Sequence, residues 1–433
     1  MNCDVLVIGG GAAGFYGAIH VAQACPRARV VLVERGKEFL TKVKVSGGGR
    51  CNVTHAVFTP SDLATHYPRG EKELLGPFHS HASGDTVAFF ESRGIALKIE
   101  EDGRMFPESN TSQTIIDCFL DEAEKLGIRL LNKTPVTDLS HHPEASFPWE
   151  VQTHDATLRA KYILMATGSN PKIWKLLQAK GHTIVSPVPS LFTFNITDDR
   201  IANIPGLSTH AEVTVLPPKS DLVLKSKKKN AEPPLVSEGP LLITHWGMSG
   251  PAILKLSAWG ARQLHARSYS FRIAVNWVPE YHEEGLFLFL MEVKAVEKKT
   301  LLRTKLFNLP KRLWANLLQA AHIEKTTTWP QVTKVQLQDL ARQLGHGVFH
   351  VRGKSTFKEE FVTAGGVTLT EINFKTFGSK VLPHLYFAGE IMDVDAITGG
   401  FNFQNAWTGA YIAAKSIAAK WAVNEGDGIL GPP

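Results

Sequence analysis

The chain has 433 residues, of which 43% are hydrophobic and 20% are charged, and its glycines and prolines are scattered. This composition excludes a disordered or low-complexity protein, and the length suggests about three domains. The net charge of +6 favours anionic ligands, but dinucleotide cofactors are themselves anions. We therefore expect a small-molecule substrate, and we regard a nucleic-acid partner as the weaker alternative.

The cysteines lie far apart and form no Cys-x-x-Cys pair; they are Cys3, Cys25, Cys51 and Cys118. This spacing excludes a zinc ribbon and a dithiol flavoenzyme, and we expect no metal. Without a disulfide framework or a basic leader, the chain is expected to be cytoplasmic. The apolar residues 406–423 have a helical period interrupted by Lys415 and Lys420, which predicts an amphipathic helix and no membrane span.

Three elements follow one another at the start of the chain. Residues 4–8 form a short apolar run, typical of a buried parallel strand. After glycines at 9–11, residues 12–24 have a helical pattern, and residues 29–34 form a second apolar strand that ends in an acid. The order strand, glycine loop, helix and strand predicts a βαβ unit.

Further elements are predicted along the chain from apolar runs and their period. The expected helices cover 86–94, 112–125, 284–321 and 331–344. The expected strands include 161–166, 211–216, 270–275 and 385–388.

The pattern changes between residues 191 and 354, where short alternating strands are separated by Pro and Lys clusters. We therefore predict an α/β protein in which residues 1–190 and 355–433 form one Rossmann-like domain. Residues 191–354 are predicted to be an insertion, a small β-barrel with a helical part over about 280–345.

The first motif is Gly9-Gly10-Gly11-Ala12-Ala13-Gly14, which fits the dinucleotide pattern G-x-G-x-x-G. Gly9 would allow the tight turn, Gly11 the approach of a diphosphate, and Gly14 the close packing of helix on strand. The helix N-terminus would supply N–H donors to the diphosphate. Glu34 follows Gly14 by twenty residues, at the end of the second strand, where an acid is expected to bind ribose hydroxyls.

A second site near the C-terminus favours FAD over NAD as the ligand. Here Gly389-Glu390 again ends a strand, and Asp393 is placed to accept hydrogen bonds from ribityl hydroxyls. Gly399-Gly400 then precede a helix expected to begin near Phe401. The first N–H groups of that helix would point at the flavin ring, and Asn402 would either add a donor or cap the helix.

At this point the sequence resembles a known family. The run Ser46-Gly47-Gly48-Gly49-Arg50-Cys51-Asn52, together with residues 387–405, resembles the YhiN/BaiN-type flavoproteins. The resemblance extends over nearly the whole chain, through residues 103–107, 244–251 and 364–367. It implies a Rossmann-like FAD domain with an inserted β-barrel and helical part, and an NAD(P)H-dependent oxidoreductase. Family members differ in substrate, so none is assigned.

The glycine run before Arg50 indicates that a ligand approaches the backbone there. Arg50 could neutralise the diphosphate, and Asn52 could bond the flavin edge or take part in catalysis. Cys51 lacks a resolving partner, so we interpret its thiol as inert packing. Further candidate FAD contacts are Ala13, Arg35, Gly48, Gly49, Cys51, Val136, Ala166, Thr167, Gly168 and Gly366.

Two more residues are candidates for catalysis. His245 lies before a glycine turn and could protonate a substrate carbon, or it could cap the helix near Pro251. Arg104 could clamp an anionic substrate, although a surface ion pair is the simpler interpretation. The basic run 225–229 has no interleaved aromatic residue and is interpreted as a solvated loop.

These residues predict a FAD-dependent oxidoreductase that acts on a small carbonyl or alkene. No second complete dinucleotide motif is present, since Gly345-x-Gly347 lacks its third glycine. NADH or NADPH is therefore expected to bind transiently over the flavin. The alternatives are an RNA-modifying flavoprotein, which shares this architecture, and a non-catalytic flavin-binding protein.

Overall fold

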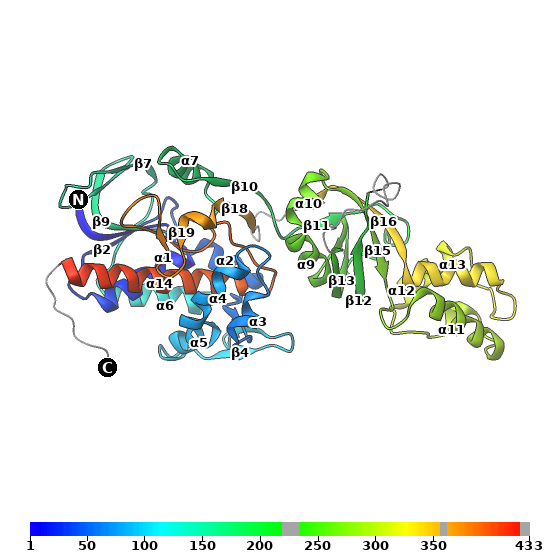
Figure 1. Cartoon of the computed structure of the whole chain (residues 1–433). Coiled ribbons are helices and arrows are strands. Elements are labelled where there is room, and N and C mark those ends of the chain that lie inside the picture. The colour runs from blue at the N-terminus through cyan, green and yellow to red at the C-terminus, as the bar shows by residue number, and fades with distance from the viewer. Residues whose placement is uncertain (219–233, 356–361, 425–433) are drawn as a thin grey trace. The chain divides into compact units, whose positions relative to one another are not determined.

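The computed structural model describes residues 1–218, 234–355 and 362–424 (Figure 1). The chain forms two compact units. The Rossmann unit comprises Met1–Val188 and Lys358–Pro433, and the inserted unit comprises Pro189–Phe357. Our expected boundaries lay at 190/191 and 354/355. The basic run 225–229 lies outside the described residues.

The Rossmann unit is built on a parallel sheet with the strand order β6-β2-β1-β9-β21. This is the order 3-2-1-4-5 of a dinucleotide-binding fold, and it confirms the predicted α/β class. The strands are β1 (Asn2–Ile8), β2 (Val30–Val33), β6 (Arg129–Leu131), β9 (Thr157–Met165) and β21 (Leu385–Phe387). Strands β1, β2 and β21 are buried along almost their whole length, which explains why their residues are mostly apolar.

The register brings the carboxyl ends of these strands to one edge. Leu131, Val33, Ile8, Met165 and Phe387 lie opposite one another across the five strands. The loops that follow them therefore share that edge, which is where ligands bind in open parallel sheets.

Short antiparallel strands extend the sheet beyond β9 and β21. They are β7 (Val136–His141), β8 (Trp149–Thr153), β19 (Ile372–Asn373) and β20 (Gly378–Ser379). A separate sheet of β3 (Thr54–His55), β5 (Arg104–Pro107) and β4 (Leu97–Ile99) lies after the glycine run.

Helices α1 (Ala12–Ala24) and α14 (Phe401–Asn424) pack side by side, although they come from opposite ends of the chain (Figure 1). A side chain at Gly17 would meet Leu164 Cδ2 at 2.3 Å, so glycine permits α1 to approach the sheet. Our expectation of an amphipathic α14 is corrected, because most of its residues are buried. Across the described chain, no helix has the length and apolarity to cross a membrane.

The described part of the Rossmann unit contains further helices. They are α2 (Thr41–Gly49), α3 (Pro60–Ala64), α4 (Glu71–Ser80), α5 (Ser83–Glu91), α6 (Gln113–Lys125), α7 (Pro171–Ala179) and η2 (Leu369–Glu371). As predicted, α6 is closed by Gly127, whose φ is +66°.

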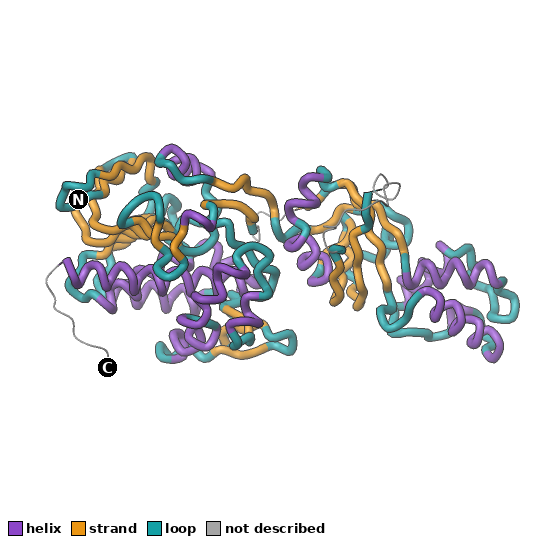
Figure 2. The backbone as a smooth tube through the Cα atoms, in the orientation of Figure 1, coloured by secondary structure: helices purple, strands orange, loops and turns teal. Residues whose placement is uncertain are grey.

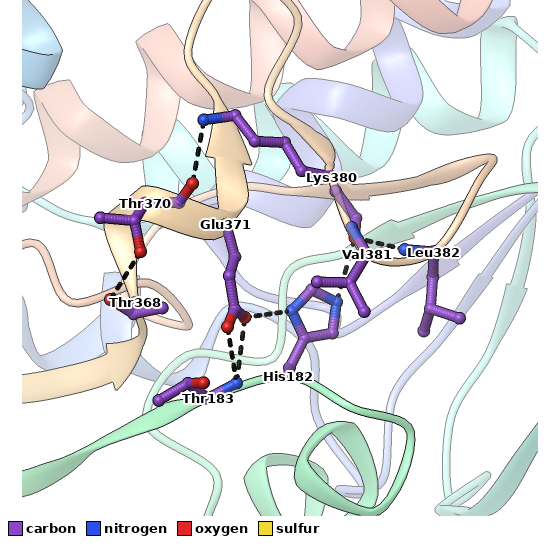
Figure 3. A network of polar contacts seen from close by, with 9 residues as sticks. His182, Thr183, Thr368, Thr370, Glu371, Lys380, Val381 and Leu382 are labelled. Carbon is purple, nitrogen blue, oxygen red and sulfur yellow. Dashed lines mark hydrogen bonds and ion pairs between the residues drawn. The ribbon is translucent and has the colours of Figure 1, made fainter.

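A polar network fixes the segment around η2 to the residues after α7 (Figure 3). The Glu371 carboxylate accepts hydrogen bonds from Thr183 N–H (3.0 Å) and from His182 Nδ1 (2.9 Å). Burial lowers the pKa of His182, which fits a neutral imidazole that accepts from the Ser379 hydroxyl at Nε2 (3.0 Å). The network lies beside the start of β10 (Ile184–Pro189), which pairs with β18 (Thr363–Val367).

The inserted unit contains a seven-stranded sheet in the order β16-β15-β12-β13-β14-β11-β17. The strands are β11 (Thr193–Asn195), β12 (Ser208–Val215), β13 (Val236–Thr244), β14 (Gly247–Ser249), β15 (Ser270–Asn276), β16 (Gly347–Arg352) and β17 (Lys354–Ser355). The two end strands, β16 and β17, are separated only by Gly353, so the sheet curls back on itself. Helices α9 (Pro251–Trp259) and α10 (Ala261–Ala266) follow β14.

The helices of residues 283–345 are grouped apart from these strands (Figure 2). They are α11 (Glu283–Val296), η1 (Leu301–Arg303), α12 (Lys311–Ala320) and α13 (Lys334–Gly345). The single helix expected over 284–321 is therefore wrong. Backbone at Glu297 becomes extended (ψ 140°) and ends α11, and Pro310 begins the next helix.

Candidate cofactor and active site

The glycine loop after β1 is shaped by close backbone contacts. A Cβ at Gly9, whose φ is +113°, would lie 2.3 Å from the Ala166 carbonyl oxygen. A Cβ at Gly14 would lie 1.9 Å from the Gly9 carbonyl oxygen. These two glycines are therefore required by the approach of β9 and of α1 to the loop.

Gly11 differs, because a Cβ there would meet no atom within 4 Å. It is the N-cap of α1, and no side chain caps this helix or places an acid in its first turn. The N–H groups of the helix end thus face open space, which is the arrangement that binds a diphosphate. The residues present fit FAD at this loop.

Glu34, directly after β2, is hydrogen-bonded to the glycine loop. Its carboxylate accepts hydrogen bonds from Gly10 N–H (2.8 Å) and Gly36 N–H (2.7 Å). Arg35 is exposed, and Val136 is half-buried just beyond Thr134, whose N–H donates to the Glu34 carbonyl (2.8 Å). The acid is therefore held against the phosphate loop, where a ribose would follow the diphosphate.

We expect Glu34→Ala to weaken FAD binding by roughly ten- to a hundredfold without unfolding the protein. The variant loses an anionic acceptor, whose charged hydrogen bond is worth about 1.5–3 kcal/mol. The measurement is a titration of apoprotein with FAD, using the exposed Glu38→Ala as control. Equal affinities for the two variants would show that the ribose is held elsewhere.

The glycine run 47–49 makes a left-handed turn at the end of α2. The three glycines have φ of +58°, +68° and +84°, and Cys51 follows at +61°. Added Cβ atoms at Gly48 and Gly49 would meet nothing within 4 Å, whereas one at Gly47 would meet Phe106 at 2.9 Å. The turn thus leaves an open backbone surface at Gly48 and Gly49, as expected for the approach of a ligand.

Arg50 and Arg104 lie together. The Arg50 guanidinium pairs with Glu100 (2.5 Å) and stacks over Phe106 (3.9 Å). Arg104 pairs with the same Glu100 (3.1 Å) and with Asp102 (2.7 Å). Both arginines therefore have carboxylate partners, so a ligand anion would have to compete with Glu100 for them.

Asn52 joins the glycine run to the last helix. In the amide orientation that satisfies both ends, its oxygen accepts from Gly400 N–H (2.9 Å) and its nitrogen donates to the Thr54 carbonyl (3.0 Å). Gly400 has a φ of +94°, and a Cβ there would lie 2.6 Å from the Thr54 carbonyl oxygen. Asn52 thus holds the loop that precedes α14, and it occupies one of the N–H groups we expected to face the flavin.

The loop after β21 contacts the N-terminal segment. A Cβ at Gly389 would lie 3.3 Å from that of Ala13. The Glu390 carboxylate pairs with Lys42 (2.5 Å) and accepts from Thr363 N–H (3.0 Å). Segments from both ends of the chain therefore meet at the carboxyl edge of the sheet. Lys42 contributes an ion pair to this contact, and the sequence analysis did not single it out.

The start of α14 is held by several groups. The Asn402 side chain bonds both backbone groups of Ala396, accepting at 3.0 Å and donating at 3.1 Å. The buried Phe401 ring stacks with His55 (4.6 Å) and His66 (4.2 Å). Asn402 therefore fixes the preceding loop by hydrogen bonds to Ala396. The two histidines lie beside the N-terminus of α14, and the sequence analysis did not single them out.

Arg69 and Asp395 form an ion pair in the same loop, with two hydrogen bonds between the guanidinium and the carboxylate. The Asp395 side chain is fully buried, and that of Arg69 is 14% exposed. The two residues are 326 positions apart in sequence, so no local signal could have found this pair.

Thr167 is a further sign of a ligand at this edge. Its hydroxyl oxygen is buried and finds no hydrogen-bond partner among the described residues. It follows Ala166, and Gly168 beyond it has a φ of +60°. An unsatisfied buried hydroxyl carries a cost that a bound polar group would remove.

Two other expected FAD contacts are placed differently. A Cβ at Gly366 would lie 2.5 Å from the Ile391 carbonyl oxygen, so the structure gives this glycine a packing role. Asp393 is half-buried, and its N–H donates to the Val367 carbonyl (3.0 Å). Both lie where β18 contacts the loop after β21.

The four cysteines are buried and form no disulfide among the described residues. Burial raises the pKa of the Cys51 thiol to about 12, which disfavours the reactive thiolate at neutral pH. We expect none of the four to react with a thiol reagent at pH 8 in the native protein, and all four to react in denaturant. Rapid native labelling of Cys51 would contradict this assignment.

His245 lies in the inserted unit, exposed on the turn between β13 and β14. The neighbouring turn is fixed by Trp246 N–H, which donates to the Thr244 hydroxyl (3.3 Å). Among the described residues, no side chain caps the N-terminus of α9, so the His245 imidazole does not cap this helix.

Comparison with known proteins places the chain in a family. The profile described as "HI0933-like protein Rossmann domain" matches residues 3–416. The chain belongs to this family. This membership confirms the resemblance to YhiN/BaiN-type flavoproteins and the Rossmann-like FAD-binding fold. The chain is therefore a FAD-dependent oxidoreductase.

The family member is similar to curated proteins along almost its whole length. A ribosomal RNA dihydrouridine synthase of Haemophilus influenzae is 27% identical, over 95% of this chain and 98% of the relative. Its namesake from Escherichia coli K12 is 28% identical, over 96% and 98%. A 3-dehydro-bile acid delta(4,6)-reductase of Clostridium scindens is 25% identical, again over 96% and 98%.

A solved structure shares the fold. The 3-ketosteroid-delta4-(5alpha)-dehydrogenase of Rhodococcus jostii RHA1 superposes with a TM-score of 0.50 at 13% identity, over 96% of this chain and 97% of that one. Our expectation that nucleic acid is not a partner gains no support from these comparisons, because two relatives are named for an action on ribosomal RNA.

Proposed function

We propose that this protein uses FAD and NAD(P)H to reduce a carbon–carbon double bond conjugated to a carbonyl, and that its substrate is a uracil ring in ribosomal RNA. The names of the relatives support the shared chemistry. The 5,6 double bond of uracil and the ring double bonds of an oxo-bile acid are both conjugated to a carbonyl. One reaction class therefore covers both kinds of relative.

The distribution of charge favours RNA. The inserted unit, residues 189–357, has 22 Lys and Arg against 13 Asp and Glu, a net charge of +9. The whole chain has 47 against 41, so the Rossmann unit has 25 against 28, a net charge of −3. The basic excess thus belongs entirely to the unit that does not carry the dinucleotide loop. A polyanionic substrate accounts for this partition, whereas FAD does not.

The reaction needs a hydride at C6 of the uracil and a proton at C5, with loss of the C5–C6 π bond. FAD, when bound and reduced, supplies the hydride. Gly11, Glu34 and the open turn at Gly48 would hold the cofactor. A general acid supplies the proton, and imidazole is the usual acid at neutral pH.

NAD(P)H is proposed to bind only transiently. The incomplete motif Gly345-x-Gly347 joins the end of α13 to β16, so it follows a helix and not a strand. A dinucleotide loop needs the opposite order. We propose the reducing cytoplasm as its location, where buried cysteines that form no disulfide are expected.

A free enone is the second candidate substrate, because the Clostridium scindens relative is named for a bile acid reductase. The experiment offers the FAD-loaded protein NADPH or NADH together with unmodified ribosomal RNA, uridine or a 3-oxo-4-ene steroid. We expect ribosomal RNA to be the one substrate of the three that is reduced. Its product, dihydrouridine, is detected by mass as a gain of two hydrogens. Turnover of the steroid without any change in RNA would replace our proposal by the second candidate.

A further inference from the structure

Among the described residues of the inserted unit, positive charge is concentrated in the segment 298–312, which runs from the end of α11 into the first turn of α12. We call it the basic segment. It contains six cations and no acidic residue: Lys298, Lys299, Arg303, Lys305, Lys311 and Arg312. All six side chains are exposed. Such a density of one sign of charge raises the local potential well above that of the surrounding surface.

Almost all of this charge is uncompensated. Lys299 lies 3.9 Å from Glu297, and this is the one ion pair made by the basic segment among the described residues. The neighbouring Lys294 is different, because its ammonium group donates to three backbone carbonyls, including that of Val332 (2.5 Å). Lys294 therefore has a structural role, whereas the cations of the basic segment have none within the fold.

The basic segment is held firmly by its backbone. Leu301 N–H donates to the Thr327 carbonyl (3.1 Å), and Trp314 Nε1 donates to the Leu301 carbonyl (3.0 Å). Phe307 packs its ring against Tyr281 and Phe289, each at 5.6 Å. The cations are thus presented on a fixed scaffold, which lowers the entropy lost when a partner binds.

Helix α12 adds to the potential. It begins directly after Pro310, with Lys311 and Arg312 in its first turn and no acidic residue there. Cations at a helix N-terminus oppose the helix dipole and destabilise the helix slightly. The arrangement makes sense if an anion binds there, since both the helix end and the two side chains attract it.

We propose that the basic segment binds the phosphate backbone of the RNA substrate. This inference rests on the proposed function, which supplies RNA as the partner. Its apolar residues, including Leu302, Leu306 and Phe307, are buried or half-buried, so it lacks the exposed apolar anchor that a membrane-binding surface uses. It also has no exposed aromatic residue for stacking on bases, so its contacts are with phosphates and independent of sequence.

The test compares two variants with the same loss of charge. The first replaces Lys298, Arg303, Lys305, Lys311 and Arg312 by Gln. The control replaces five exposed cations of the Rossmann unit that make no ion pair among the described residues, Lys72, Arg129, Lys172, Lys175 and Lys375, by Gln. Binding of fluorescent, protein-free ribosomal RNA to the FAD-loaded proteins is measured from about 50 to 300 mM salt. Anionic phosphatidylserine vesicles serve as the competing probe.

We expect the first variant to bind RNA at least tenfold more weakly at about 0.1 M salt. Each lost phosphate contact reduces the magnitude of the slope of log affinity against log salt by about 0.7–0.9, so the loss of five contacts should reduce it by roughly 4. The control should match the wild type. FAD content and thermal unfolding show whether each variant is folded. If the first variant unfolds, the double variant Lys311→Gln with Arg312→Gln replaces it, and we expect this double variant to bind RNA severalfold more weakly than the wild type.

Equal RNA binding by the first variant and the control would overturn the proposal, as would wild-type binding to vesicles in preference to RNA. The proposed function fails separately. In that case the wild type forms no dihydrouridine, while the difference in RNA binding between the two variants still reports on the basic segment.

Discussion

Replacing Gly11 by valine should leave the apoprotein folded and lower its affinity for FAD by at least about a hundredfold, or roughly 3 kcal/mol. The backbone at Gly11 has φ −95° and ψ −166°, which valine adopts without strain, and a Cβ there meets no protein atom within 4 Å. The valine side chain would instead fill the space that a diphosphate needs at the end of α1. The measurements are flavin content after purification and a FAD titration of the apoprotein.

Gly14→Ala is the matched control, because it separates loss of the ligand from loss of the fold. Its Cβ would lie 1.9 Å from the Gly9 carbonyl oxygen, so the loop or the helix has to move. We expect this variant to unfold at lower denaturant concentration even without FAD. A Gly11→Val protein that is folded and retains full flavin would show that the diphosphate binds elsewhere.

Arg69→Met should destabilise the Rossmann unit by about 3–5 kcal/mol, the usual cost of leaving a buried charge without its partner. Asp395 is fully buried and receives two hydrogen bonds from Arg69. Methionine keeps much of the side-chain volume but cannot compensate the carboxylate. Because Asp395 lies in the loop before α14, flavin retention should fall together with stability. Urea unfolding, monitored by tryptophan fluorescence, gives the change in free energy.

The double variant Arg69→Met with Asp395→Asn distinguishes charge from packing. Removing both charges avoids the uncompensated carboxylate, so most of the lost stability should return. A double variant as unstable as Arg69→Met alone would mean that packing, and not the ion pair, holds this loop.

The parts of the fold that follow from local spacing could be predicted from the sequence. Helix α1 spans the predicted residues because Gly9, Gly11 and Gly14 fix where the strand ends and the helix begins. The apolar runs of β1 and β21 mark buried parallel strands, since both faces of the sheet are covered. The carboxyl edge of the sheet is built from these elements, which is why the glycine loop and Glu34 could be placed there from the sequence.

Other features depend on contacts that local patterns do not encode. The partners Arg69 and Asp395, and likewise Lys42 and Glu390, meet only when the two ends of the chain come together. Gly366 has the sequence context of a ligand loop, yet its neighbour in space is the Ile391 carbonyl. The helix predicted over 284–321 failed for another reason, because residues 297–310 carry apolar side chains but form a short 3-10 helix and turns between α11 and α12.

A single-turnover measurement tests most directly whether reduced flavin in this protein passes its hydride to uracil in RNA. The FAD-loaded protein is reduced with one equivalent of NADPH under anaerobic conditions and mixed with unmodified ribosomal RNA, while flavin absorbance is recorded. We expect the flavin to be reoxidised and one dihydrouridine to appear for each flavin. Flavin that stays reduced in the presence of RNA, but is reoxidised by a 3-oxo-4-ene steroid, would contradict the proposed function.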